Sequence, residues 1–333
     1  MDFEVFKQRL IDWMNERYDA EFECQNVLKN NGIYLTGITG YGEGQNVSPN
    51  IYIDELYDSV NKGMSFEAAA SIVETKYAHA LQEKIEMETD IFDINMVKHK
   101  IVARIVNFSM NEELLRGVPY KLLAGDLALT YRLIHSVDVM GIASSLISNQ
   151  EFEAWNISLD ELHNLSMENT ERIFPARIKN MKDVMHEIIQ NHAPDQVREE
   201  MLEGLEMGGD IDIEMYVISN DTCINGATAV LYPSVQEWIA QKFGEAAYIL
   251  PSSIHEVIVV PFAEEGDKEF FNNLVKEANM QAVDLQDKLS DNIYQFRKGE
   301  LVNVNQFEIE LNKAVDEALR ELELPEHDPG IEM

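Results

Sequence analysis

The stretch YILPSSIHEVIVVPF, residues 248–262, decides the fold, because it is the most apolar continuous run in the chain. Apolar residues on both sides of Pro251 predict two strands, at 248–250 and 254–262, that form a hairpin with the proline at the bend. Helical spacing of apolar residues precedes this stretch at 235–243 and follows it at 267–289. The stretch therefore predicts the centre of a C-terminal sheet that is covered by helices.

Further strand patterns surround this central hairpin. One pair, at 215–220 and 227–232, flanks the turn sequence DTCING, and a last strand pattern at 292–297 follows the long helix. The resulting order, β-β-α-β-β-α-β, predicts an α+β fold with largely antiparallel sheets covered by amphipathic helices.

The preceding part of the chain mixes helical and strand patterns. Asn30-Asn31-Gly32 is a hairpin signal, and Ser158 with Glu161 forms a capping box that starts a helix. We predict helices at 3–18, 65–84, 158–174 and 181–192, a further helix after Pro194, and strands at 22–29, 33–39, 101–108, 127–133 and 140–148. Gly208-Gly209 predicts a linker, which divides the chain into a mixed α/β region at 1–207, an α+β domain at 208–322 and a disordered tail at 323–333.

The charge of the chain limits the classes of partner. Sixty acidic residues stand against 26 basic ones, which gives a net charge of −34. A field of this sign repels the phosphates of nucleic acids and of anionic lipids, so we expect neither nucleic acid nor a membrane as a partner. The alternative is a decoy that imitates nucleic acid, although no face shows acids at a phosphate-like repeat.

Cysteine use and hydropathy indicate the compartment. Cys24 and Cys223 are far apart and no CxxC motif is present, so we expect two free thiols, which suit the reducing cytosol. The N-terminus has no apolar signal core, and no run of 18 apolar residues occurs. The sequence predicts a soluble cytoplasmic protein.

The central stretch also carries a cluster of chemically versatile side chains: Ser252, Ser253, His255 and Glu256. Side chains alternate between the two faces of a strand, so Ser253 and His255 would share a face while Glu256 would point to the other. One hypothesis is a hydrolase that uses Ser253 and His255, with its acid supplied from elsewhere, although GxSxG is absent. The other is a hairpin turn at Pro-Ser-Ser with His255 at the sheet margin.

Cofactor and metal motifs are absent from the sequence. The loop GITGYGEGQNVSPN at 37–50 contains Gly40, Gly42 and Gly44, but it lacks the GxGxxG and Lys-Ser/Thr patterns that nucleotides require. The eight histidines include no HExxH, and no EF-hand loop is present. We expect no cofactor and no metal. Most of the 15 methionines fall at apolar helical positions, which predicts that they pack in the core.

Three stretches together resemble a known family: GIYLTGIT…NVSPNIYIDELYDSV, VNFSMNEELLRGVPYKLLAGDLALTYRLI and GATAVLYPSVQ…YILPSSIHEVIVVP. The similarity spans about residues 20–300 and is to a family of uncharacterised bacterial proteins known only as a domain of unknown function. This resemblance implies a bacterial cytosolic setting and supplies no reaction, cofactor or catalytic residue.

The sequence therefore leaves the function unknown. Because a well-patterned fold carries no catalytic motif, a binding or regulatory module that interacts with proteins is the first hypothesis. Whether the chain is an enzyme, and its oligomeric state, stay open.

Overall fold

The computed structural model describes residues 1–42, 49–83, 90–138, 141–207, 214–244, 247–261, 267–307, 309–310 and 313. Gly44, the predicted linker Gly208-Gly209 and the predicted tail at 323–333 lie outside these residues. The chain forms two compact units. Unit 1 comprises residues 1–102, 110–119 and 131–162, and unit 2 comprises residues 103–109, 120–130 and 163–333.

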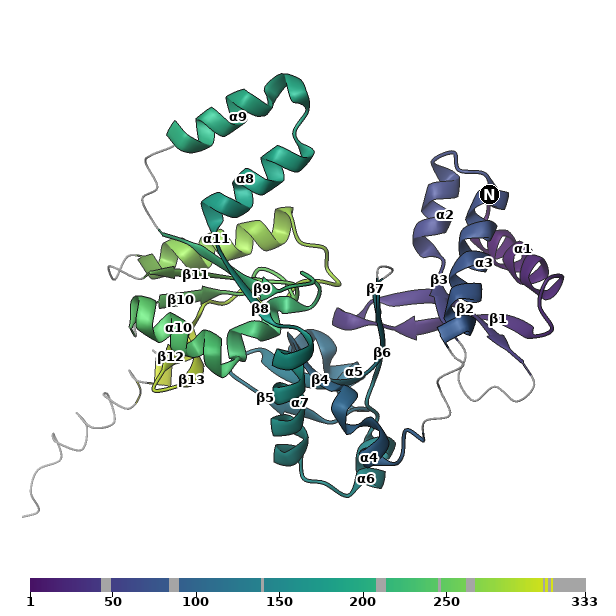
Figure 1. Ribbon diagram of the computed structural model, residues 1–333, viewed down its shortest axis with the longest axis horizontal. Coiled ribbons are helices and arrows are strands. Elements are labelled where there is room, and N and C mark those ends of the chain that lie inside the picture. The colour runs from purple at the N-terminus through teal and green to yellow at the C-terminus, as the bar shows by residue number, and fades with distance from the viewer. Residues whose placement is uncertain are drawn as a thin grey trace, which may run out of the picture. The chain divides into compact units, whose positions relative to one another are not determined.

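Unit 1 begins with a three-stranded antiparallel sheet and three helices (Figure 1). The strands are β1 (Glu21–Leu28), β2 (Tyr34–Tyr41) and β3 (Asn50–Tyr52), and the helices are α1 (Phe3–Asn15), α2 (Asp54–Asn61) and α3 (Phe66–Glu83). The predicted hairpin turn between β1 and β2 is confirmed, because Asn31 and Gly32 adopt positive φ angles of 58° and 71°.

The core of these elements follows from helical spacing. Phe6, Leu10 and Met14 recur every four residues along α1, and all three are fully buried. The Ser65 hydroxyl accepts a hydrogen bond from the Ala68 N–H at 3.2 Å, so the predicted cap of α3 is also confirmed.

Gly40 lies in β2, and close packing explains why a glycine occupies this position. A Cβ atom at this position would lie 2.6 Å from the Phe22 ring and 2.8 Å from the Tyr77 hydroxyl. The two rings meet edge to face with centroids 5.0 Å apart. A glycine that the sequence places in a polar loop is therefore part of the closely packed core of unit 1.

The two cysteines should differ in reactivity. Burial raises the pKa of the Cys24 thiol to about 11, whereas Cys223 is exposed. Because the thiolate is the nucleophile, the folded protein should react with one equivalent of a disulfide reagent at about pH 8, at Cys223, and with a second only in denaturant. Mass spectrometry of the labelled peptides measures this order, and equal labelling of both cysteines in the folded protein would contradict it.

Six further short elements described in the first half each lie within one unit. They are α4 (Ile94–Val97), η3 (Lys98–Lys100), α5 (Glu112–Leu115), β5 (Tyr120–Leu122), β7 (Gly141–Leu146) and α6 (Asn149–Trp155). Four of the described elements have residues in both units: β4 (Ile101–Asn107), η4 (Ser109–Asn111), β6 (Leu127–Asp138) and α7 (Leu159–Ile173). Within unit 1, β7 pairs with β6, and within unit 2, β5 pairs with β6, both antiparallel.

Unit 2 contains a six-stranded antiparallel sheet in the order β13-β12-β10-β11-β9-β8 (Figure 1). The strands are β8 (Ala176–Asn180), β9 (Tyr216–Asn220), β10 (Ala247–Leu250), β11 (Val257–Pro261), β12 (Tyr294–Arg297) and β13 (Glu300–Asn303). The helices are α8 (Met181–His192), α9 (Asp195–Met207), α10 (Pro233–Phe243) and α11 (Asp267–Gln281). The predicted α+β class, with antiparallel sheets and amphipathic helices, is confirmed, and β10 and β11 lie at the centre of the sheet.

The strand predicted at 227–232 is wrong. Residues 226–231 form the 3₁₀ helix η5 (Gly226–Leu231), and β9 pairs with β8 and β11 instead. Ala227, Ala229 and Val230 are all buried. An apolar run that is buried on every side has the same sequence pattern in a strand and in a helical turn. The Gly-Ala-Thr-Ala composition also carries little preference for a strand.

Two boundaries in the C-terminal half also differ from prediction. The second strand of the central hairpin begins at Val257 rather than at Ile254. Helix α11 ends at Gln281 rather than at 289, and the next residues form a turn in which the Asp284 carbonyl accepts from the N–H groups of Asp287 and Lys288. The strand at 292–297 is also not the last one, because a two-residue turn with positive φ joins β12 to a further strand, β13.

The core of unit 2 lies between the sheet and α11. Tyr248 and Val260 contact Phe271 and Val275 of α11, and all four are buried. Ile258 is partly buried and packs against the same cluster, so the predicted covering of the central strands by this helix is confirmed. No helix in the described part of the chain is both long and apolar enough to cross a membrane.

Candidate functional site

The predicted cluster Ser252–Glu256 lies in a bend between β10 and β11, not in a strand. The Ser253 hydroxyl donates to the Glu256 carboxylate at 2.9 Å and accepts from the backbone N–H of His255 at 3.0 Å. Ser252 contributes a backbone N–H to the Leu250 carbonyl. The alternation expected for a strand therefore does not apply, and Ser253 meets Glu256 rather than the imidazole.

The His255 ring is held by two other segments. Its Nδ1 accepts from the Asn225 N–H at 3.1 Å, and its Nε2 lies 3.4 Å from the Asp287 carboxylate. A ring whose Nδ1 accepts carries its proton on Nε2, which faces the Asp287 carboxylate. Both ring nitrogens are thus engaged away from Ser253, an arrangement that positions the loop rather than activating a hydroxyl.

The backbone around this bend is packed against β9 and η5. The His255 carbonyl accepts from the Ser219 hydroxyl at 2.7 Å, and the Ile254 carbonyl accepts from the Ala227 N–H. A Cβ on Gly226 would lie 2.6 Å from the His255 carbonyl oxygen, so only glycine fits there. These contacts show how the Ser252–Glu256 bend is fixed in place.

A polar network around Asp126 is a feature that sequence reasoning missed. The carboxylate accepts from the Ser290 hydroxyl at 2.8 Å and from the amides of Asn107 at 2.9 Å and Asn292 at 3.1 Å. The Tyr294 hydroxyl donates to the same carboxylate. Burial, and then the Asp126 charge, raises the pKa of Tyr294, which keeps its hydroxyl a donor.

The sequence signals near these residues concern only their immediate neighbours in the chain. Gly125-Asp126 reads as a turn, and Gly125 does adopt a positive φ of 55° against Asn303. Ser290 and Asn292 lie in a largely polar stretch, QDKLSDN at 286–292, which gives no sign that they are buried. Asp126 and Ser290 are 164 positions apart, so the sequence does not indicate their meeting. The carboxylate is surrounded by donors, which gives it a structural role in unit 2.

A serine–imidazole contact occurs elsewhere, in unit 1. His135 sits at a register shift between β6 and β7, and its Nε2 lies 3.0 Å from the Ser145 hydroxyl. The nearby Glu151 carboxylate already accepts from the N–H and hydroxyl of Ser148 at the start of α6. The His135–Ser145 contact therefore joins two strands.

His135 should make unit 1 sensitive to acid. Burial, and then the charges of Lys100 and Arg132, lowers the pKa of His135 below 6.5. The unfolded chain binds this proton more readily, so stability is present above about pH 6.5 and is lost as the pH falls through the lower pKa of the folded state. Urea unfolding between pH 7.5 and 5 should show a steeper loss for the wild type than for His135→Gln. Identical slopes would contradict the assignment.

A helical hairpin of unit 2 exposes several large apolar side chains. Helices α8 and α9 pack against each other and extend from β8 and β9, with α9 as the outer helix (Figure 1). Four large apolar side chains of this α8–α9 hairpin are exposed: Met185 (44%), Ile188 (54%), Val197 (39%) and Met201 (46%). The expectation that most methionines pack in the core is wrong: Met1, Met96, Met185, Met201 and Met280 are exposed, and among the described methionines Met14 is the one that is buried.

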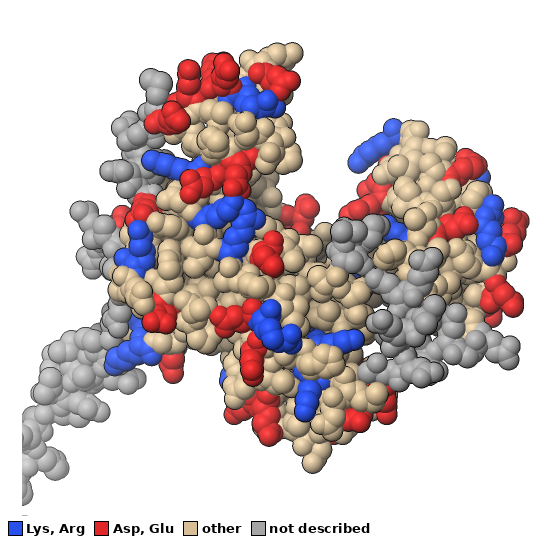
Figure 2. Space-filling model, in the orientation of Figure 1, with Lys and Arg blue, Asp and Glu red and all other residues tan. Residues whose placement is uncertain are grey.

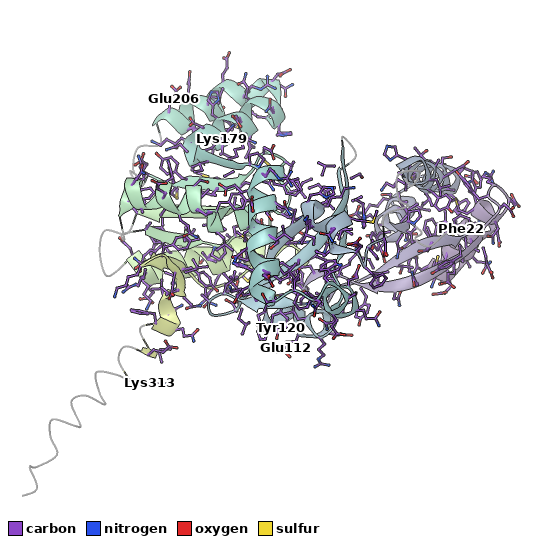
Figure 3. The ribbon with its side chains drawn as sticks, turned by 60° about the horizontal axis from the view of Figure 1, so that its bottom comes forward. Phe22, Glu112, Tyr120, Lys179, Glu206 and Lys313 are labelled. Carbon is purple, nitrogen blue, oxygen red and sulfur yellow. The ribbon has the colours of Figure 1, made fainter. Side chains whose placement is uncertain are left out.

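The base of the α8–α9 hairpin is polar. Arg177 and Lys179 of β8 both pair with Glu187 of α8, Arg177 at 3.2 Å. An open hollow of about 560 Å³ lies beside these side chains and is lined from β8, α8 and Tyr216 of β9. Figure 3 labels Lys179 at this base and Glu206 on the outer helix. In the parts of the chain that the structure covers, no group of three or more His, Cys, Asp or Glu side chains is placed to hold a metal ion.

The fold and these sites define an α+β protein with a fixed central bend, a buried polar network and an exposed apolar helical hairpin. The chain belongs to the family of unknown function DUF5688, whose model matches residues 3–298. The resemblance seen in the sequence is thereby confirmed. No curated protein and no solved structure matched the chain in the comparisons.

Proposed function

We propose that this protein is a protein-binding module of the bacterial cytoplasm whose binding surface is the α8–α9 hairpin. The observation that carries the proposal is the exposure of Met185, Ile188, Val197 and Met201 within one helical pair. Contiguous exposed apolar side chains rimmed by polar ones are typical of interaction sites, and methionine is enriched at protein interfaces.

The competing hypotheses have less support. A hydrolase built on Ser253 and His255 needs the imidazole to accept the serine proton, yet Nδ1 accepts from Asn225 and Nε2 lies against Asp287. A nucleic acid decoy needs a continuous acidic ridge, and on the face in Figure 2 basic and acidic side chains are interspersed over most of the surface. Two free thiols support a reducing compartment.

Affinity capture from the organism that carries the gene tests the proposal. The bait is the full chain as wild type, as Met185→Glu/Met201→Glu, or as Val5→Glu, a matched control because Val5 is an exposed apolar residue on a helix of unit 1. A partner should be enriched by the wild type and by Val5→Glu and be lost with the double variant, and it should rebind after purification. Equal capture by all three baits would overturn the proposal.

A further inference from the structure

We infer that the partner presents an amphipathic helix with basic residues along its flank, an inference that rests on the proposed function. The chemistry follows from the α8–α9 hairpin itself. Met185 and Ile188 are three positions apart and Val197 and Met201 are four apart, so each pair forms a stripe along one side of its helix. Each stripe offers a further helix an apolar surface with helical periodicity.

The backbone of the hairpin favours a helix over an extended strand as the ligand. The N–H and C=O groups inside α8 and α9 are used within each helix, so an added strand finds no row of main-chain partners there. A helical ligand needs no main-chain partners, because its own backbone N–H and C=O groups are hydrogen-bonded within the helix. Its contacts are then side chain to side chain, and the flexible thioethers of Met185 and Met201 adapt to such a surface.

The charge of α9 sets the charge of the ligand. Its acidic residues are Asp195, Glu199, Glu200, Glu203 and Glu206. The one basic residue of α9, Arg198, is already engaged, by Asp195 at 2.6 Å and by the Ala193 carbonyl at 2.9 Å. In Figure 2 acidic side chains dominate over α9. A cationic ligand is therefore attracted to this helix and an acidic one repelled.

The acids are not equivalent around the helix. At about 100° per residue, Glu200 lies about 60° from Val197 and borders the Val197–Met201 stripe, whereas Glu199, Glu203 and Glu206 lie about 120° or more from both residues of the stripe. Glu200 is thus placed to meet a lysine that flanks the apolar side of a bound helix. Glu199, on the opposite side of α9, contributes only to the general field of the chain.

A synthetic probe tests this inference in solution. The probe is a fluorescent Leu/Lys peptide of about five helical turns with apolar residues on one face. It is compared with a scrambled peptide of the same composition and with a Leu/Glu peptide of the same pattern, by anisotropy at about 0.15 M salt, where distant charges are screened. The wild type should bind the Leu/Lys helix about tenfold or more tightly than either comparator.

Protein variants separate specific binding from general attraction. Met185→Glu/Met201→Glu makes the chain more acidic, so general attraction to lysines would rise, whereas binding on the apolar stripes should weaken about tenfold or more. Glu200→Gln should weaken binding more than Glu199→Gln, although both remove the same charge from neighbouring positions. Met201→Gln gives a second variant if the double one fails to fold, as judged by circular dichroism.

Three results would overturn the inference: equal binding of the scrambled peptide, equal binding of the Leu/Glu peptide, or equal effects of Glu200→Gln and Glu199→Gln. A concentration-dependent dimer in sedimentation that Met201→Gln abolishes would also overturn it, because the surface would then bind a second copy. If the peptide fails while capture from cells still depends on the α8–α9 hairpin, the ligand chemistry is wrong and the proposed function stands. If the peptide does not bind and capture from cells does not depend on the α8–α9 hairpin, the ligand chemistry and the proposed function are both wrong.

Discussion

Replacing Asp126 by alanine should lower the free energy of unfolding by about 3–5 kcal/mol, because several buried donors lose their acceptor together. Ser290 and Tyr294 are fully buried and both donate to this carboxylate, as do two asparagine amides. Alanine removes the acceptor, and these buried donors are then left without a hydrogen-bond partner because no water replaces it. Urea unfolding, followed by a signal from unit 2, measures the change.

A smaller substitution in the same network serves as the control. Tyr294→Phe removes one hydroxyl and keeps the ring, so its cost should be about 1–2 kcal/mol, clearly below that of Asp126→Ala. A loss of less than about 1 kcal/mol for Asp126→Ala would show that water replaces the carboxylate, and that the network does not hold unit 2 together.

Phe271→Ala should lower the free energy of unfolding by a similar amount, but for a different reason. The ring is 1% exposed and lies 6.0 Å, edge to face, from the Tyr248 ring in the cluster under α11. Its removal leaves a cavity between the helix and the central strands, which costs about 3–5 kcal/mol. The same unfolding experiment measures it.

The neighbouring Phe270 gives a matched control, because it is the same residue type, one position away, and 54% exposed. Phe270→Ala should change the free energy of unfolding by about 0.5 kcal/mol or less. Similar losses for the two variants would mean that α11 does not pack on the sheet through Phe271.

Local signals in the sequence are sufficient to predict much of the fold. Ser158 and Glu161 form the capping box that their spacing predicts, with the Ser158 N–H 2.8 Å from the Glu161 carboxylate. The strands on either side of Pro251 pair as an antiparallel hairpin. These features depend on neighbours in the chain, so residue type and spacing determine them.

Features that depend on distant contacts could not be predicted. Burial on all sides makes η5 look like a strand, and the bend at Ser253 depends on Asp287, whose carbonyl accepts from the Ile254 N–H. The periodicity of Met185 and Met201 correctly indicates one apolar side of each helix. Whether that side is covered depends on what else packs there, which spacing does not reveal.

The most direct test of the central claim is photo-crosslinking inside cells. A photoreactive benzoylphenylalanine replaces Met201 on the α8–α9 hairpin or, as the control, Val5 on α1; both positions are exposed. We predict a discrete covalent adduct with another protein from position 201 and none from position 5, and a crosslinked peptide with an amphipathic basic sequence. No adduct at 201, or the same adducts from both positions, would contradict the claim that the α8–α9 hairpin is a protein-binding surface.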